Sequence, residues 1–247
     1  MGLICTPYGY SGAPKVLGLV AYQSVILADK PVAYWPLNET GGTVANDLSG
    51  NGFNGTFEGG VTLASVAFPA GGMAPVFNGS SGYVTGSQLI TSATANVALE
   101  AWVNFQGVST PPGSCFLKNG TYQNGYSFGN SNGTYDNSGN YFLGLYEITS
   151  WNPTTSPIGT TGWQHCVNVI GPNSESAFYI NGVQVATNSN SNIDGPTGEW
   201  VIGADDANSS SANAIARFFS GALCNAAIYN SALTATQIQN HYNAGIA

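Results

Sequence analysis

The sequence predicts an all-β protein: a sandwich of two antiparallel sheets that ends in a short C-terminal helix. Three observations lead to this fold class. Short runs of alternating apolar and polar residues recur along the chain, which is the pattern of half-buried strands. Turn-forming residues, including 33 glycines, separate these runs. Only the last residues combine a helical pattern with a helix-start signal, and 247 residues suit one large β domain.

The clearest strand is predicted at residues 97–105, VALEAWVNF. Its alternation puts Val97, Leu99, Ala101, Val103 and Phe105 on one face, and Glu100, Trp102 and Asn104 on the other. Further strands are predicted at 141–147 (YFLGLYE), 163–170 (WQHCVNVI), 200–203 (WVIG) and 222–229 (ALCNAAIY). Residues 177–181 (AFYIN) lead into Gly182 and then VQVAT. Asn181-Gly182 between two alternating runs is the strongest short signal for a β-hairpin.

The two ends of the chain are predicted to differ. Thr234 and Gln237 have the spacing of a capping box, and Gly245 suits the end of the helix that follows. Residues 1–20 are rich in Gly, Pro and Tyr and are interpreted as an extended arm, either a loose terminus or a tether to a partner. A short helical turn is expected at 21–29, so the chain divides into an arm (1–23) and one domain (24–247).

The charge composition excludes several classes of partner. Only 6% of the residues are charged and the net charge is −8, with Lys15, Lys30, Lys118 and Arg217 the basic residues. Such a chain cannot neutralise a row of phosphates, so nucleic-acid binding is not expected, nor is membrane insertion. The uncharged polar surface is typical of extracellular and virion proteins. The N-terminus lacks the pattern of a signal peptide, which fits either release by lysis or a native leader absent from this sequence.

The four cysteines, Cys5, Cys115, Cys166 and Cys224, contain no CxxC pair that would predict zinc. Buried thiols are one interpretation, and a Cys166–Cys224 or Cys5–Cys115 disulfide is the other.

Several segments resemble bacterial and phage laminin-G-like domains of the concanavalin A-like lectin and glucanase group. The segments are VILADKPVAYWPLNET, DLSGNGFNGT, VALEAWVNF, GWQHCVNVI with AFYINGVQVAT, and WVIGADD with FFSGALCNAAIYNSALTATQIQNHYNAG. They follow the family's order over about residues 24–247. The resemblance implies a jelly roll that recognises glycans or proteins. The closing strand carries Cys224-Asn225 where the family usually has an acidic pair.

Catalysis is not expected, although the resemblance includes glucan-cleaving enzymes. Glycoside hydrolysis normally needs two carboxylates that flank the scissile bond. The E-x-D-x-x-E pattern of the glucanases is absent, and Glu100 is interpreted as a structural hydrogen-bond acceptor. His165 is expected to be a hydrogen-bonded structural residue, and His241 lies near the end of the predicted helix.

Two candidate sites remain. Asp47, Ser49 and Asn51, with Asp205 contributing from another loop, offer oxygen ligands that would suit calcium, and a plain Asn/Asp/Gly turn is the alternative. No other cofactor is expected. Exposed aromatic rings beside amides and carboxylates suit sugars, and the candidate glycan-binding residues are Tyr126, Tyr135, Asp136, Tyr146, Trp151 and Trp102. The alternative is that these rings fill the core.

The sequence therefore predicts a non-catalytic virion structural protein: a phage head-decoration, fibre or tail-associated subunit that displays a laminin-G-like module. Its expected partners are viral capsid or tail proteins, cell-surface glycans and, because closed symmetry is the default, further copies of itself. A secreted bacterial carbohydrate-binding or adhesion module is the alternative. The first interpretation places the protein at a virion surface, and the second places it outside a cell.

Overall fold

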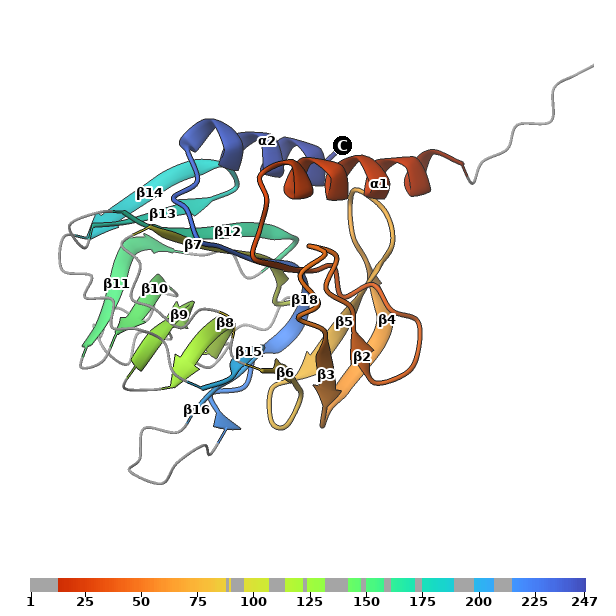
Figure 1. Cartoon of the computed structure of the whole chain (residues 1–247), viewed down its shortest axis with the longest axis horizontal. Helices are drawn as coiled ribbons and strands as arrows, with labels where there is room; N and C mark the ends of the chain where they lie inside the picture. Colours follow the sequence, from red (N-terminus) through yellow and green to blue (C-terminus); the bar gives the residue numbers. More distant parts are fainter. Residues whose placement is uncertain are drawn as a thin grey trace, which may run out of the picture.

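The computed structural model describes residues 13–87, 89, 96–106, 114–121, 124–131, 142–147, 150–157, 161–171, 175–188, 198–206 and 215–247. Two antiparallel sheets lie face to face, with two helices on the outside of one of them (Figure 1). This arrangement confirms the predicted jelly-roll sandwich. Within the described residues, no helix is long and apolar enough to cross a membrane.

Sheet A carries the helices. Its strands, in spatial order, are β14 (Val183–Asn188), β13 (Ser176–Ile180), β12 (Gln164–Ile170), β7 (Val97–Asn104), β18 (Ser220–Tyr229), β5 (Met73–Asn78) and β4 (Val61–Ala67), and β1 (Ala33–Trp35) also pairs with β18. The predicted hairpin at Asn181-Gly182 joins β13 to β14, and both residues have the positive φ that such a turn requires.

Sheet B forms the opposite layer. Its strands, in order, are β11 (Ser150–Pro157), β10 (Phe142–Glu147), β9 (Asn124–Ser131), β8 (Ser114–Thr121), β15 (Trp200–Ile202), β6 (Tyr83–Gly86), β3 (Gly55–Glu58) and β2 (Val44–Ala45). A two-stranded ribbon, β16 (Asp205–Asp206) with β17 (Ile215–Ala216), follows β15.

The core fills the space between the sheets. The predicted apolar stripe of β7, from Val97 to Val103, is fully buried there. Aromatic rings add to it, and Trp35 stacks on Trp200 with ring centroids 3.9 Å apart. Cys166 and Cys224 are buried free thiols, so the disulfide between them is not formed. Cys5 lies outside the described residues, so the Cys5–Cys115 disulfide stays a prediction. Burial raises the pKa of the Cys166 and Cys224 thiols, which keeps them protonated.

The C-terminal helix α2 (Ala235–Gly245) is confirmed, including the capping box between Thr234 and Gln237. The extended arm predicted for residues 1–20 is wrong at residues 13–20, whereas the helical turn expected at 21–29 is the last part of a longer helix. Helix α1 spans Ala13–Ala28 and crosses the expected boundary between arm and domain.

Helix α1 forms because it packs on the domain, not because its sequence has a strong helical period. Tyr22 and Ile26 are fully buried on sheet A, and α1 lies beside α2 (Figure 1). A Cβ on Gly18 would come within 2.6 Å of the Ala70 carbonyl oxygen, so this glycine allows the helix to approach the loop between β4 and β5. Residues 1–12 of the predicted arm lie outside the described residues.

Candidate functional site

The outer face of sheet A, beneath the two helices, holds a buried acid–base network around Glu100 on β7. One carboxylate oxygen, Oε1, lies 2.9 Å from His165 Nε2. The other, Oε2, lies 2.9 Å from Nδ1 of His241 on α2 and accepts a hydrogen bond of 3.1 Å from the Tyr229 hydroxyl. Glu100 and both histidines are fully buried. The network therefore joins three strands of the sheet to the C-terminal helix.

The network also fixes the end of α1. His241 Nε2 lies 2.9 Å from Asp29 Oδ2, and the Gln237 amide donates to Asp29 Oδ1 at 2.8 Å. Burial by itself lowers the pKa of His241, but the charges of Glu100 and Asp29 and their hydrogen bonds outweigh it and raise the pKa to about 9. Burial would likewise raise the pKa of Glu100, but cationic His241 and the bonds from both histidines hold it well below its usual range.

These shifts describe a cation held between two carboxylates, Glu100–His241–Asp29. Because Glu100 and both imidazole rings are sealed beneath the helices, a substrate cannot reach them. The prediction that Glu100 is a structural acceptor agrees with this geometry, and so does the predicted hydrogen-bonded role of His165.

The structure contradicts the prediction that Trp102 binds glycans. Its side chain is fully buried, its indole N–H donates to the Tyr22 hydroxyl at 2.9 Å, and Tyr242 stacks on it. Gly245 lies so close to this ring that a Cβ there would clash with it. The alternation correctly placed Trp102 away from the core between the sheets, but both helices cover that outer face and exclude ligands.

The loop that was predicted to hold calcium is organised by Asp47. Its Oδ1 accepts backbone N–H bonds from Tyr34 at 3.0 Å and Ser49 at 2.8 Å. Its Oδ2 accepts the Phe53 N–H at 2.9 Å and the Ser49 hydroxyl at 2.8 Å. The Asn51 amide donates to the Val32 carbonyl. Both carboxylate oxygens are thus engaged as in a self-bonded turn, which was the alternative interpretation.

The fourth predicted ligand, Asp205, has other partners. Its carboxylate lies 3.3 Å from Lys118 Nζ and 3.5 Å from an Arg217 guanidinium nitrogen. Among the residues that the structure describes, no three His, Cys, Asp or Glu side chains are grouped to hold a metal. The calcium site stays a prediction.

The outer face of sheet B carries a row of directly opposed positions that crosses several strands. From β6 to β11 the row runs through Thr85, Val201, Lys118, Ser127, Tyr146 and Trp151. Opposed positions of antiparallel strands belong to the same face of a sheet. Tyr146 and Trp151 are therefore neighbouring positions on the face where Lys118 pairs with Asp205. Val201 and Lys118 are buried, so the middle of this row is covered.

Tyr126, another predicted glycan residue, does not belong to this row. Tyr126 is opposite the buried Asn119, one position out of step, so it belongs to the face that looks into the sandwich. Tyr135 and Asp136 lie outside the described residues, as do the side chains of Tyr126, Tyr146 and Trp151.

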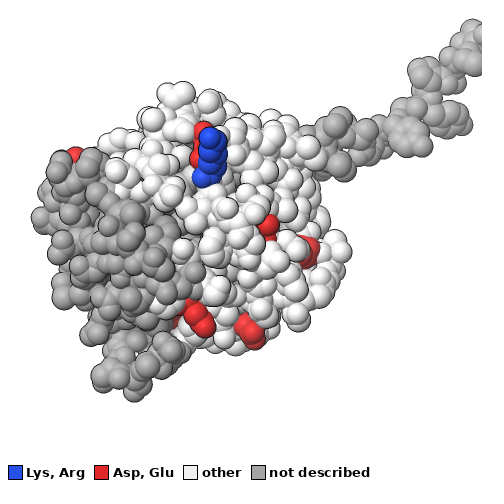
Figure 2. All heavy atoms as spheres, viewed as in Figure 1, with Lys and Arg blue, Asp and Glu red and all other residues white. Residues whose placement is uncertain are grey.

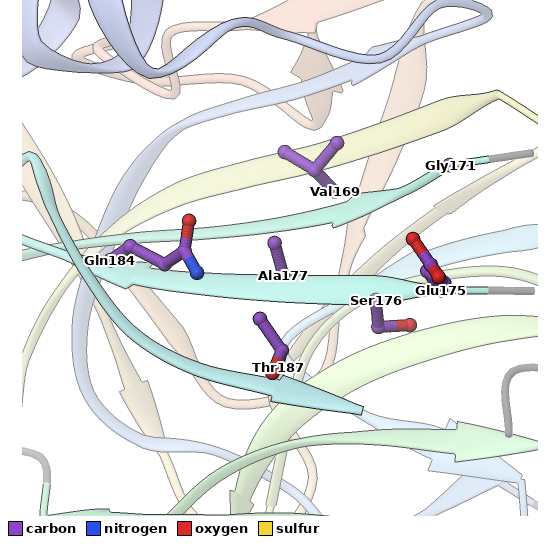
Figure 3. Close-up of a pocket in the computed structure, with 7 residues that line it drawn as sticks. All are labelled: Val169, Gly171, Glu175, Ser176, Ala177, Gln184 and Thr187. Atoms are coloured by element: carbon purple, nitrogen blue, oxygen red, sulfur yellow. The ribbon is translucent and has the colours of Figure 1, made fainter. Parts of the chain in front are cut away.

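A second surface feature was not anticipated from the sequence. On the outer face of sheet A, a shallow hollow of about 430 Å³ lies over β12, β13 and β14 (Figure 3). It is lined by Val169, Gly171, Glu175, Ser176, Ala177, Gln184 and Thr187. The hairpin strands were predicted, but the sequence does not indicate which part of their face the helices leave open.

Comparison with solved structures identifies the same architecture in binding domains. The binding domain of botulinum neurotoxin serotype D/C matches with a TM-score of 0.63 and 15% identity, over 88% of this chain and 52% of that chain. Domain 4 of the extracellular arabinanase AbnA from Geobacillus stearothermophilus, solved with arabinotriose, matches with a TM-score of 0.59 and 22% identity, over 86% of this chain and 98% of that one.

These likenesses establish the fold. The chain spans about half the length of the toxin domains that it matches. No curated protein sequence matches the chain. A family model matches residues 78–239, well over half of the sequence, from the end of β5 through β6 to β18 and into α2. The chain belongs to this laminin-G-type family of the concanavalin A-like lectin/glucanases superfamily.

Proposed function

We propose that this protein is a non-catalytic carbohydrate-binding module and that the outer face of sheet B is its principal binding surface. The observation that carries the proposal is the register that opposes Tyr146 to Trp151 and places Ser127 next to them in the same row. A pyranose has apolar C–H faces and a polar rim, so two neighbouring aromatic positions beside hydrogen-bonding groups suit it.

The burial of the acid–base groups supports a binding role without catalysis. Glu100, His165 and His241 bond to one another beneath the helices, and Asp205 is engaged by Lys118. The surface in Figure 2 is largely uncharged over the described residues, with scattered acidic side chains. Such a surface suits neutral polyols better than phosphates or other anions.

The structural neighbours point the same way. One is an arabinanase domain in complex with arabinotriose, and toxin binding domains are described with SialylT and with two ganglioside molecules. One toxin binding domain is described with the protein synaptotagmin II, so protein recognition is an outcome that the test must also detect.

A panel of immobilised poly- and oligosaccharides tests the proposal. We expect saturable binding to at least one glycan. Trp151→Ala and Tyr146→Ala should each weaken it about tenfold, because a sugar-stacking ring contributes on the order of 1 kcal/mol or more. Met73→Ala, which removes an exposed apolar side chain from sheet A, is the control. A flat response across the panel, or turnover that Glu100→Gln abolishes, would refute a binding module.

We propose further that the module is displayed on a virion, as a homo-oligomer attached to capsid or tail proteins. The low charge of the chain supports an external setting, which a secreted bacterial adhesion module would share. Density-gradient fractionation of the source lysate, followed by mass spectrometry, separates the two. The chain should sediment with virus-sized particles, and recovery only from the top of the gradient would favour the secreted module.

A further inference from the structure

The hollow on sheet A lies on the opposite layer of the sandwich from the row of sheet B. Val169, Ala177 and Thr187 are directly opposed across β12, β13 and β14, so they share one face. This is the face that α2 covers farther along, where Tyr242 lies over His165. None of the described residues that line the hollow belongs to a helix, so the hollow occupies a part of the face that α2 leaves open (Figure 3).

A β-bulge shapes the rim of this hollow. Phe178 is opposite Ala186, but Tyr179 is opposite Gln184, so β14 holds one residue more than its partner. In a regular strand, Gln184 and Thr187 would point to opposite faces because they are three residues apart. The extra residue returns both to the same face, and both line the hollow.

The lining has an apolar floor and a polar rim. Val169 and Ala177 form the floor, while the exposed side chains of Glu175, Gln184 and Thr187 stand around it (Figure 3). The buried Tyr179 hydroxyl donates to Gln184 Oε1 at 3.1 Å. This bond orients the amide and leaves its Nε2 donor toward the hollow. A volume of about 430 Å³ lies within the range of small-ligand sites, about 300–1,000 Å³.

The charge of the hollow narrows the class of ligand. Among the described residues that line the hollow, Glu175 is the charged one and none is a lysine or arginine, and the whole chain carries a net charge of −8. An anionic sugar would meet repulsion that nothing in the lining offsets. A neutral sugar can place C–H groups on Val169 and Ala177 and exchange hydrogen bonds with Gln184, Thr187 and Glu175.

We propose that this hollow is a second saccharide-binding site, one that accepts a neutral sugar unit and rejects uronic or other acidic sugars through Glu175. Its existence is independent of the sheet B surface, but the choice of a saccharide as the ligand rests on the proposed function. Gln184 and Thr187 are its hydrogen-bonding residues, and Tyr179 is the positioning residue that orients Gln184.

Methyl NMR of the full chain provides a readout confined to this site, because Val169 and Ala177 carry methyl groups on its floor. The probes are arabinotriose, xylotetraose and cellotetraose as neutral oligosaccharides, and β-1,4-linked tetraglucuronate as the acidic counterpart of cellotetraose. We expect saturable shifts of both methyl signals with at least one neutral probe and none with tetraglucuronate.

Substitutions then assign the roles. Gln184→Ala should weaken neutral binding about threefold to tenfold, the effect of one lost hydrogen bond, while Gln23→Ala on α1 should have no effect. Glu175→Gln should allow tetraglucuronate to shift the floor methyls, and Glu58→Gln on β3 should not. Trp151→Ala should leave these shifts unchanged, because Trp151 lies on the other sheet.

The outcomes separate the two proposals. If neutral saccharides bind in a way that depends on Trp151 but never shift Val169 or Ala177, the second site is refuted and the proposed function stands. If tetraglucuronate and cellotetraose shift the floor equally, the selectivity is refuted. If the floor responds to a neutral saccharide while Trp151→Ala and Tyr146→Ala leave all binding unchanged, the hollow is the binding site and the assignment to sheet B is wrong. If no probe shifts any methyl signal, the hollow is not a site for these sugars.

Discussion

His241→Gln removes the cation that lies between the carboxylates of Glu100 and Asp29, and it should destabilise the protein in a pH-dependent way. Both imidazole nitrogens of His241 lie 2.9 Å from a carboxylate oxygen, and the ring is fully buried. A glutamine side chain can still form hydrogen bonds at this position, but it carries no charge. The variant therefore tests the charge more than the packing.

The magnitude follows from the pKa of His241. A rise from 6.5 to about 9 corresponds to about 3 kcal/mol of stabilisation, at about 1.4 kcal/mol per pH unit. Breaking a buried ion pair typically costs about 3–5 kcal/mol, which agrees with this figure. Because the folded pKa lies above the unfolded one, the contribution is complete below about pH 6.5 and is lost as the pH rises through about 9.

At low pH, Glu100 determines how the free energy of unfolding changes with pH. Its pKa is held below the usual range in the folded state, so its contribution is present above about pH 4.5 and is lost as the pH falls further. The free-energy difference between the wild type and His241→Gln should therefore be largest between about pH 4.5 and 6.5. Buried Tyr22, Tyr229 and the cysteines, whose pKa values are raised by burial, destabilise both proteins alike at high pH.

Urea unfolding at pH 6 and at pH 9.5, followed by tryptophan fluorescence, measures this difference. We expect about 3 kcal/mol at pH 6 and less than about 1 kcal/mol at pH 9.5. Gln239→Ala, also on α2, is the control and should change the free energy of unfolding by less than about 0.5 kcal/mol at either pH. An equal difference at both pH values would show that His241 is not charged in the folded protein, and the reasoning would fail.

Four further outcomes are expected. Asp47→Ala should lower the free energy of unfolding by about 3 kcal/mol, because four hydrogen bonds to one carboxylate are lost. EDTA should not change the melting temperature, and a calcium-dependent rise of several degrees would instead support the calcium site. Trp102→Ala should cost about 3–5 kcal/mol in urea unfolding, with glycan affinity unchanged in the folded fraction. Thr234→Ala should cost about 1 kcal/mol through the lost helix cap, and Ser231→Ala, just outside the cap, should cost little.

The sequence predicted the strands well where one face is apolar and a turn signal lies beside it. The alternation of β7 and the Asn181-Gly182 hairpin required no tertiary information, because side-chain direction in a strand has a period of two. The Thr234 capping box likewise depends on residues close in sequence. Each of these features depends on residues that are close in sequence, so the sequence pattern is sufficient to predict it.

The errors arose where distant elements meet. Helix α1 is largely apolar and has only a weak helical period, so only its packing on sheet A reveals that Tyr22 is buried. The misassignment of Trp102 has the same origin, since a strand pattern separates two faces but does not show that helices cover the second. The bulge that brings Gln184 and Thr187 together depends on pairing with β13, which no sequence period reports.

The position of the helices explains why the buried ionisable residues and the proposed binding surfaces lie on different parts of the domain. On most of the outer face of sheet A, α1 and α2 exclude water, so ionisable groups there must neutralise one another, as Glu100, His241 and Asp29 do. The two proposed binding surfaces lie instead on the uncovered β12–β14 corner and on sheet B. Because these surfaces lie on opposite layers, one domain with both sites occupied would join two polysaccharide chains, and avidity would exceed the affinity of either site alone. A loss of polysaccharide cross-linking in Gln184→Ala, with Trp151 intact, is the direct consequence of this geometry.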